Sequence, residues 1–268
     1  MVPEGVCYLT NESSERFDKI AANYATSEVH SMSPTIRLLH QLVNLEAGAS
    51  VCDMACGAGH LALSFATRAG RLVGVDPAPG MLDAFRRLAA QRGIEVETVE
   101  AYAESIPLRG DQFDLVVSRL APHHFDDVDR AVAEMVRLTK IGGRVAIIDL
   151  EGHEDADIDE FNHKLEVLHD PTHIRSYTAA RWKSMFENSG LKVEVLKNGL
   201  SERPQGTTVG RWCEIGSSGA ESEAEIRASL QRAPDSFLEA LNIKRLGGEF
   251  LLPIRTLLVV GTRDAAHR

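Results

Sequence analysis

The sequence predicts an α/β protein with a seven-stranded, mostly parallel sheet, flanking helices and helical cap insertions. Two observations support this prediction. Short runs rich in β-branched residues alternate with segments of helical apolar spacing along the first 150 residues. Glycines stand where the expected helices end, at Gly70, Gly93 and Gly142, as is typical of left-handed helix caps. Strands that alternate with helices form parallel sheets whose two faces are both covered.

The expected strands and helices follow one another in a regular order. Five strands are expected in the first half, at Val51–Met54, Arg71–Val75, Glu95–Val99, Phe113–Ser118 and Arg144–Leu150. The helices between them are expected at Leu61–Ala69, Ala78–Gln91 and Val128–Thr139. The second half adds a helix at Thr178–Asn188 and two strands, at Leu191–Leu196 and Ile254–Val260.

The stretch Asn198–Pro253 is longer than the usual connection between neighbouring strands. It contains helical patterns at Ser222–Gln231 and Pro234–Leu241. We interpret it as an insertion that covers the mouth of a pocket or contacts a second copy of the chain in a homodimer. The segment Phe17–Leu45 is expected to be helical and to form a lid from the other side. The acidic run Glu151–Glu160 is expected to be a solvated face or a flexible edge.

Composition limits the partners that this chain can have. The formal net charge of −10 argues against nucleic acid and against an anionic membrane surface, because both carry dense negative charge. No run is long and apolar enough to cross a membrane, and Met1–Thr10 lacks the pattern of a signal peptide. We therefore expect a cytoplasmic protein. Paired metal-ligand spacing is absent from its cysteines, Cys7, Cys52, Cys56 and Cys213.

A glycine-rich loop, Asp53–Gly59, follows the first expected strand and precedes a helix. Glycines at such a turn let the backbone approach a ligand closely, and the helix directs its first N–H groups at the same place. The loop by itself indicates a dinucleotide site or only a tight turn. It lacks the full G-x-G-x-x-G pattern of dinucleotide sites, and an acidic residue, Asp53, opens it.

The second expected strand ends in Asp76. A carboxylate at this place can accept hydrogen bonds from both hydroxyls of a ribose. The alternative is a structural role, in which Asp76 caps the helix that begins after Pro77. The glycine loop one strand earlier favours ribose binding.

Together these motifs resemble the class I S-adenosyl-L-methionine (AdoMet)-dependent methyltransferases, a Rossmann-like family. The similarity is closest to the ubiquinone/menaquinone-methyltransferase-like (type 11) branch. It is carried by Asp53–Gly59, Gly74-Val75-Asp76, Ala103–Pro107, Phe113–Ser118 and Lys140–Arg144. The resemblance is specific from Val51 to Leu150, weaker from Phe17 to Tyr24, and fades after Tyr177.

The resemblance implies a role for each cofactor-binding residue. Asp53 would hold the amino group of the methionine end, with Arg119 beside the same end. The loop residues Ala55, Gly57 and Gly59 would make room for the cofactor. Asp76 and Pro77 would lie at the ribose, and Met81, Tyr102, Ala103 and Glu104 would lie at the adenine.

Two positions depart from the family pattern. Ala55 stands where many members have glycine. Ala101-Tyr102 stands where many have Gly-Asp, whose aspartate reaches the adenine amino group. Tyr102 would instead stack on the ring or donate a hydrogen bond. Tyr24 is expected to close over the cofactor from the lid, with ordinary core packing as its alternative. His30 follows and would line the same entrance.

The pair His123-His124 follows the fourth expected strand, and the resemblance places it near the methyl acceptor. Methyl transfer needs alignment above all, and for some acceptors a base. Histidine titrates near neutral pH and suits that task. The alternative is structural, with one histidine capping the next helix and the other packed beneath the loop.

The segment Phe161–Tyr177 is rich in histidine. His169 and His173 would share a helix face, but Pro171 between them argues against a continuous helix. No metal site is therefore expected. The segment, with Asp170, is interpreted as a polar wall of the acceptor pocket or as a solvated turn.

The sequence thus predicts one methyltransferase domain over residues 1–268. It comprises a lid at residues 1–45, an AdoMet-binding core at 46–150, and cap elements with the last two strands at 151–268. The expected activity is methyl transfer from AdoMet to a small-molecule acceptor. The alternative is an enzyme of the same fold that binds AdoMet and catalyses another reaction, such as a cyclisation. A nicotinamide-dependent oxidoreductase is disfavoured by the incomplete pyrophosphate pattern.

Overall fold

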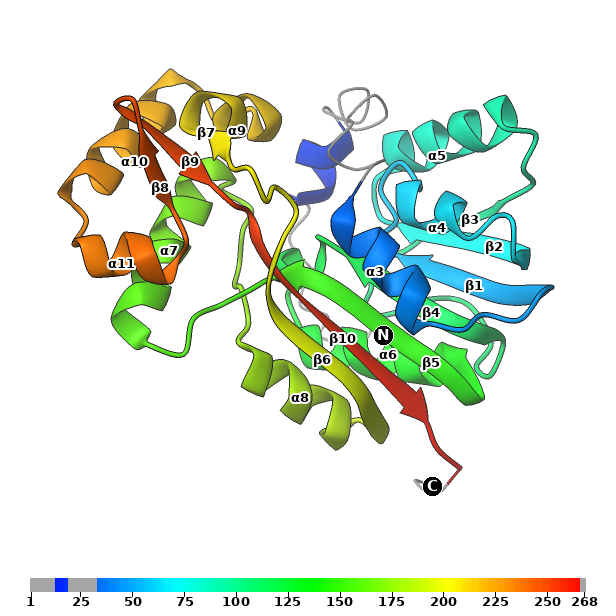
Figure 1. Ribbon diagram of the computed structural model, residues 1–268. Coiled ribbons are helices and arrows are strands. Elements are labelled where there is room, and N and C mark those ends of the chain that lie inside the picture. The colour runs from blue at the N-terminus through cyan, green and yellow to red at the C-terminus, as the bar shows by residue number, and fades with distance from the viewer. Residues whose placement is uncertain (1–12, 19–32, 266–268) are drawn as a thin grey trace, which may run out of the picture.

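A seven-stranded sheet in the order β3-β2-β1-β4-β5-β10-β6 forms the centre of the computed structural model (Figure 1). The structure describes residues 13–18 and 33–265. Five strands are parallel, at Ala49–Met54 (β1), Ala69–Asp76 (β2), Glu97–Glu100 (β3), Phe113–Arg119 (β4) and Thr139–Leu150 (β5). The last strand of the chain, β10 (Arg255–Arg263), runs antiparallel between β5 and β6 (Leu191–Ser201). The predicted fold class is confirmed.

Helices cover both faces of this sheet. One face carries α3 (Pro34–Leu42), α4 (His60–Ser64) and α5 (Pro79–Gln91), and the other carries α6 (Val128–Leu138) and α8 (Ala179–Asn188). Helix α6 illustrates how these helices pack on the sheet. Its buried residues recur at helical spacing and so form one apolar face, and Asp127 caps its first turn. Those buried residues are Val128, Ala131, Val132, Met135 and Leu138.

A separate group of elements forms a cap beyond the strand ends. It consists of α7 (Ala156–His169), α9 (Val209–Gly216), α10 (Ala220–Arg232), α11 (Asp235–Ala240) and the strands β7 (Thr207–Thr208), β8 (Lys244–Leu246) and β9 (Glu249–Leu252). These elements enclose an apolar cluster of their own, which includes Trp212, Ile226 and Phe250. Figure 1 shows the cap beside the main sheet; α7 lies between β5 and α8 along the chain, and the other cap elements lie between β6 and β10.

The cap differs from the sequence-based expectation in two respects. Helix α7 begins inside the acidic run that was expected to be a solvated face or a flexible edge; much of the run is exposed as expected, but Glu151 and Asp159 are buried. Asp155 caps it by accepting hydrogen bonds from Asp157 N and Ile158 N, and Leu165 is buried in the cap cluster. The small antiparallel sheet β7-β9-β8 was not predicted. Its strands are too short for a pattern of alternating residues to identify them.

The boundaries of two elements also differ. Helix α4 ends at Ser64 instead of continuing to Ala69, because Phe65 N bonds to Ala62 O and tightens the last turn. Strand β5 begins at Thr139, where α6 was expected to end and five residues before Arg144.

The N-terminal segment is described only in part. Residues 13–18 and α3 are helical, as expected for this part of the chain, and its role as a lid stays a prediction. Tyr24 and His30 lie outside the described residues. Among the helices of the described ranges, none is long and apolar enough to cross a membrane.

Candidate active site

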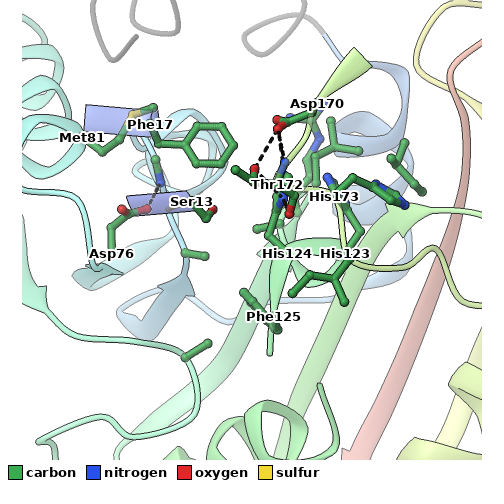
Figure 2. A pocket seen from close by; sticks show the side chains of 18 of the residues that line it. Ser13, Phe17, Asp76, Met81, His123, His124, Phe125, Asp170, Thr172 and His173 are labelled. Carbon is green, nitrogen blue, oxygen red and sulfur yellow. Dashed lines mark hydrogen bonds and ion pairs between the residues drawn. The ribbon is translucent and has the colours of Figure 1, made fainter. Parts of the chain in front are cut away.

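A cavity of about 320 Å³ opens at the carboxyl ends of the parallel strands, between the sheet and the cap. It brings together most of the residues that the sequence singled out. They are Asp53, Ala55, Gly57, Asp76, Pro77, Met81, Tyr102, Ala103, Glu104, Arg119, His123 and His124. Gly59 does not line this cavity, and Tyr24 is not among the described residues. Figure 2 shows Asp76 and Met81 on one side and His123 and His124 on the other.

Asp53, near the end of β1, is a buried carboxylate that is held by a backbone hydrogen bond. Its Oδ2 accepts a hydrogen bond from Ala62 N, in α4, at 2.9 Å. Burial raises the pKa of Asp53 to about 7, with a smaller contribution from Asp76, while the Ala62 N–H and Arg119 act in the opposite direction. A cationic group in the cavity would therefore favour the ionised form of this carboxyl.

Asp76, at the end of β2, has the structural role considered from sequence, and its role in ribose binding stays a prediction. Its Oδ1 accepts from Ala78 N at 2.9 Å, at the start of α5, and its Oδ2 accepts from Gly57 N at 2.8 Å. Burial raises the pKa of Asp76 to about 6, against the effect of these two bonds. Each carboxylate oxygen can accept a second hydrogen bond, so its structural bonds leave room for a ligand.

The glycines of the loop serve different purposes. Gly57 has φ +50°, and a Cβ there would meet only Met81 Sδ, at 3.9 Å. Gly59 has φ +79°, and a Cβ there would lie 1.9 Å from the Phe85 ring. The packing of α4 against α5 therefore requires glycine at position 59. Gly59 does not line the cavity itself.

Arg119, at the end of β4, is a buried cation. Its Nη2 lies 3.0 Å from Glu202 Oε2, and Glu202 also accepts hydrogen bonds from Ser33 Oγ, at 2.7 Å, and Thr35 Oγ1. The ion pair lacks the alignment of a hydrogen bond, and Arg119 Nε and Nη2 have no hydrogen-bond partner in the described part of the chain. Two buried donors at the cavity wall suit an anionic ligand group. Glu202 was not predicted, because only the fold brings it near β4.

The segment after β3 forms another part of the wall. Glu104 is buried, and its Oε1 accepts from Asp127 N at 3.4 Å, just before α6. Burial raises the pKa of Glu104. Tyr102 and Ala103 line the cavity beside it.

The helix at residues 13–18 connects the two sides of the cavity. Ser14 Oγ donates to Pro77 O at 3.1 Å, and Asp18 Oδ1 accepts from Gly80 N at 2.6 Å. Arg16 reaches the cap, where its Nε lies 3.1 Å from Asp170 Oδ1. This segment therefore contacts both the cofactor side and the cap side of the cavity.

His123 is held by a buried aspartate. Its Nδ1 lies 2.6 Å from Oδ1 of Asp149, which is near the end of β5 and is fully buried. Burial lowers the pKa of His123, but the charge and hydrogen bond of Asp149 outweigh it, so the net shift is upward. Asp149 was not predicted as a site residue.

His124 is in a different environment. Its Nδ1 donates to Thr172 O at 2.9 Å, and the Phe17 ring meets it edge-on at 5.1 Å (Figure 2). Burial, with His123 nearby, lowers the pKa of His124 to about 3. His124 is therefore neutral at physiological pH.

The histidine-rich segment contributes a polar wall. Glu166, His169, Asp170 and His173 all line the cavity. Helix α7 ends at His169, before Pro171, as the proline indicated. Glu166 was not singled out from sequence, although its spacing of three residues from both His163 and His169 on a helix is the signal that could have found it. No group of three or more acidic, histidine or cysteine side chains within residues 13–18 and 33–265 is arranged to hold a metal ion.

Comparison with known proteins agrees with this geometry. A family model described as a methyltransferase domain matches residues 52–147. The chain is 29% identical over 258 residues to the uncharacterized methyltransferase YcgJ of Bacillus subtilis, covering 95% of this chain and 100% of that protein. The YcgJ crystal structure matches with a TM-score of 0.78 and 30% identity, covering 87% of this chain and 99% of that chain.

Two further relatives are informative. The demethylmenaquinone methyltransferase of Thermus thermophilus is 34% identical over 139 residues, covering 50% of this chain and 63% of that protein. The [4+2]-cyclase SpnF matches with a TM-score of 0.68 and 15% identity, covering 95% of this chain and 96% of that chain, which shows the fold alone. The arrangement of the site and these similarities lead to one conclusion: the chain belongs to the class I AdoMet-dependent methyltransferases, in the ubiquinone/menaquinone-methyltransferase-like branch.

Proposed function

We propose that this protein binds AdoMet in the cavity and transfers its methyl group to a small-molecule acceptor. The supporting observation is the charge pattern at three adjacent strand ends. Asp53 on β1 and Arg119 on β4 place a buried carboxylate and a buried guanidinium beside each other, and Asp76 on β2 adds a second carboxylate. The first two are complementary to a zwitterionic amino acid, and the third to a ribose diol.

The remaining wall fits the rest of the cofactor. The cavity wall on the side of Asp76 combines apolar and polar side chains, as an adenine ring requires. It is formed by Met81, Tyr102, Ala103 and Glu104. Bound AdoMet would supply a methyl group on a positively charged sulfur. The protein's own task is to align the acceptor with that group and to exclude water from the cavity.

Calorimetry with purified AdoMet tests cofactor binding. We expect micromolar binding to the wild-type protein and its loss in Asp76→Ala. Asp83→Ala is the matched control, because Asp83 is an exposed aspartate of α5 that pairs with Arg86 at the surface. A folded wild-type protein that takes up no AdoMet would contradict the proposal.

A second reaction class deserves a separate test, because the fold is shared with a cyclase. If the methyl group is transferred, each molecule of product is accompanied by one molecule of S-adenosylhomocysteine. If AdoMet stays intact while an acceptor is consumed, the protein belongs with the non-methylating enzymes of this fold. Mass spectrometry of the reaction mixture distinguishes the two.

A further inference from the structure

We propose that His123 is the catalytic base of the methyl transfer, that Asp149 positions it, and that the acceptor is an uncharged phenol or enol hydroxyl. This inference rests on the proposed function and extends it to the substrate class. It is carried by the buried His123–Asp149 pair at the cavity wall and by the side chains that surround it.

The His123 ring is fixed on one side and exposed to the cavity on the other. Its Nδ1 is engaged by Asp149 Oδ1 at 2.6 Å, so Nε2 is the nitrogen left for a ligand. Within the described ranges, Nε2 has no hydrogen-bond partner. The backbone is fixed as well, because Ile174 N and Arg175 N both donate to His123 O, at 2.9 Å and 3.1 Å.

The charges around His123 favour its taking up a proton. Asp149 Oδ2 is buried and has no hydrogen-bond partner among the described residues, so its negative charge acts mainly on this ring. Glu166 on α7 and Asp170 after it add negative charge. The ionisable groups that face His123 from the neighbouring elements are Asp149, Glu166, Asp170, His124, His169 and His173.

The neighbouring histidines are poor candidates for the same task. Burial lowers the pKa of His124 to about 3, of His169 to about 4 and of His173 to about 2. His124 Nδ1 is occupied by Thr172 O, and His169 stacks on Trp212 at 4.2 Å. In this cluster His123 is therefore the ring whose surroundings stabilise an imidazolium.

The cavity also constrains the acceptor. A base is useful only if the attacking atom loses a proton, and histidine is matched to phenols and enols more closely than to alkyl alcohols. Ionised Glu166 disfavours an acceptor that carries a carboxylate or a phosphate, and the cation Arg16 is already paired with Asp170. The side chains of Trp212, Ile215 and Ile254 line the same cavity and provide an apolar surface for a ring.

The proposed step is balanced in atoms and charge. The hydroxyl proton moves to His123 Nε2 while an oxygen electron pair forms the bond to the methyl carbon. The bond between that carbon and the sulfur breaks, and its electron pair stays on the sulfur, which becomes the neutral thioether of S-adenosylhomocysteine. The imidazolium returns its proton to water when the products leave.

An acceptor panel tests the substrate class. Catechol, 2-naphthol, 4-nitrophenol and acetylacetone represent acidic hydroxyls, while benzylamine, thiophenol and benzoate represent other nucleophiles. We expect release of S-adenosylhomocysteine with hydroxyl compounds alone. Release only with the other nucleophiles, or with no compound although calorimetry shows AdoMet bound, would overturn this inference and leave the proposed cofactor site standing. Absence of AdoMet binding would instead remove the proposed function.

Variants test the role of His123 with the best panel acceptor. His123→Gln should lower kcat by about 10²- to 10³-fold, with the Kd for AdoMet unchanged, because general-base catalysis contributes about that much. His163→Gln is the matched control. It removes another ring of the cluster, at 5.5 Å from the His173 ring, and His163 does not line the cavity. Equal kcat values in His123→Gln and wild type would overturn the assignment.

The pH profile of Asp149→Asn tests whether Asp149 positions His123 or only stabilises the fold. The base must be neutral to act, so kcat rises with pH through the pKa of His123. Because Asp149 raises that pKa, its removal should shift the acid limb of the pH profile to lower pH and reduce the plateau about tenfold. If Asp149 had a purely structural role, the variant would have a lower maximal kcat, but the pH at the midpoint of the acid limb would not change.

Side-chain ¹⁵N NMR of the protein without AdoMet gives a readout that does not depend on activity. We expect the His123 ring to titrate at higher pH than the His124 ring, with the proton of its neutral form on Nδ1. The assignment follows from the signal that disappears in His123→Gln. If the His124 ring titrates at higher pH than the His123 ring, the proposal is wrong.

Discussion

The guanidinium of Arg119 and the carboxylate of Glu202 form a buried ion pair, with Nη2 3.0 Å from Oε2. The pair connects the end of β4, in the cofactor half of the cavity, to the residue at which the chain enters the cap. Ser33 and Thr35, at the start of α3, donate to the same carboxylate. One acidic group thus links the sheet, the start of the cap and α3.

Glu202→Gln should destabilise the protein strongly. The substitution leaves Arg119 buried without its counter-charge, which costs about 3–5 kcal/mol when one partner of a buried pair is removed. Urea denaturation followed by circular dichroism measures the loss. Glu225→Gln is the control, because its ion pair with Arg232 is exposed and should contribute less than about 1 kcal/mol. Equal midpoints for the two variants would contradict this prediction.

Affinity for AdoMet should fall as the pH falls below about 7. The pKa of Asp53 is raised to about 7 and that of Asp76 to about 6, so both lose their charge between pH 7.5 and pH 5.5. The neutral forms lose the attraction for an ammonium group and accept hydrogen bonds from hydroxyls less well. We expect the Kd measured by calorimetry to increase at least tenfold across this range. Asp53→Asn should bind weakly at pH 8 and show a smaller dependence on pH.

Glu166→Gln should stabilise the ligand-free protein at pH 8. Burial raises the pKa of Glu166 to about 7, so the folded state holds this proton more tightly than the unfolded chain does. The neutral carboxyl therefore favours folding at low pH, and this contribution is lost as pH rises through about 7. Because the group faces the cavity, we expect a gain on the order of 1 kcal/mol for the variant at pH 8.

The same comparison at low pH provides the check. Below about pH 4.5 both states of the wild-type protein are protonated at this position, and the gain should disappear. Glu160→Gln, on the exposed side of α7, should leave stability unchanged at both pH values. A gain that is the same at pH 8 and at pH 4.5 would argue against a raised pKa.

Ala55→Gly should stabilise the protein. Ala55 has φ +53°, and a left-handed conformation costs a non-glycine residue roughly 1–2 kcal/mol. Part of this gain is offset by the greater freedom of glycine in the unfolded chain, which leaves about 0.5–1 kcal/mol. Ala90→Gly, in the exposed part of α5, should have the opposite sign, because glycine weakens a helix. Thermal unfolding of the two variants measures the difference.

Several features of the site followed from local patterns in the sequence. The carboxylates Asp53 and Asp76 were predicted because each stands at the end of a recognisable strand, and parallel strand ends meet at one edge of a sheet. The sequence also indicated that Pro171 would interrupt the histidine-rich segment, and α7 ends at His169. Such predictions succeed where the physical cause lies within a few residues of the effect.

Other features depended on contacts between distant parts of the chain. Asp149 was first predicted only as part of a buried strand, and its partner His123 is 26 positions away. The acidic run Glu151–Glu160 was expected to be a solvated face or a flexible edge, and nothing in it indicated that α7 would continue beyond it and place Glu166 at the cavity. Gly59 was expected to make room for the cofactor, whereas Phe85 packs where its Cβ would be.

The sequence by itself determined how the seven strands of the main sheet alternate with helices along the chain, and the edge of the sheet at which the site forms. Periodicity, glycines and proline act over one or two turns of chain, so they can be recognised without the fold. The tertiary structure alone decided which histidine is paired with a buried carboxylate and which carboxylate neutralises Arg119. Burial and pairing set the charge state of these groups, and both depend on elements that meet only after the sheet and the cap have packed together.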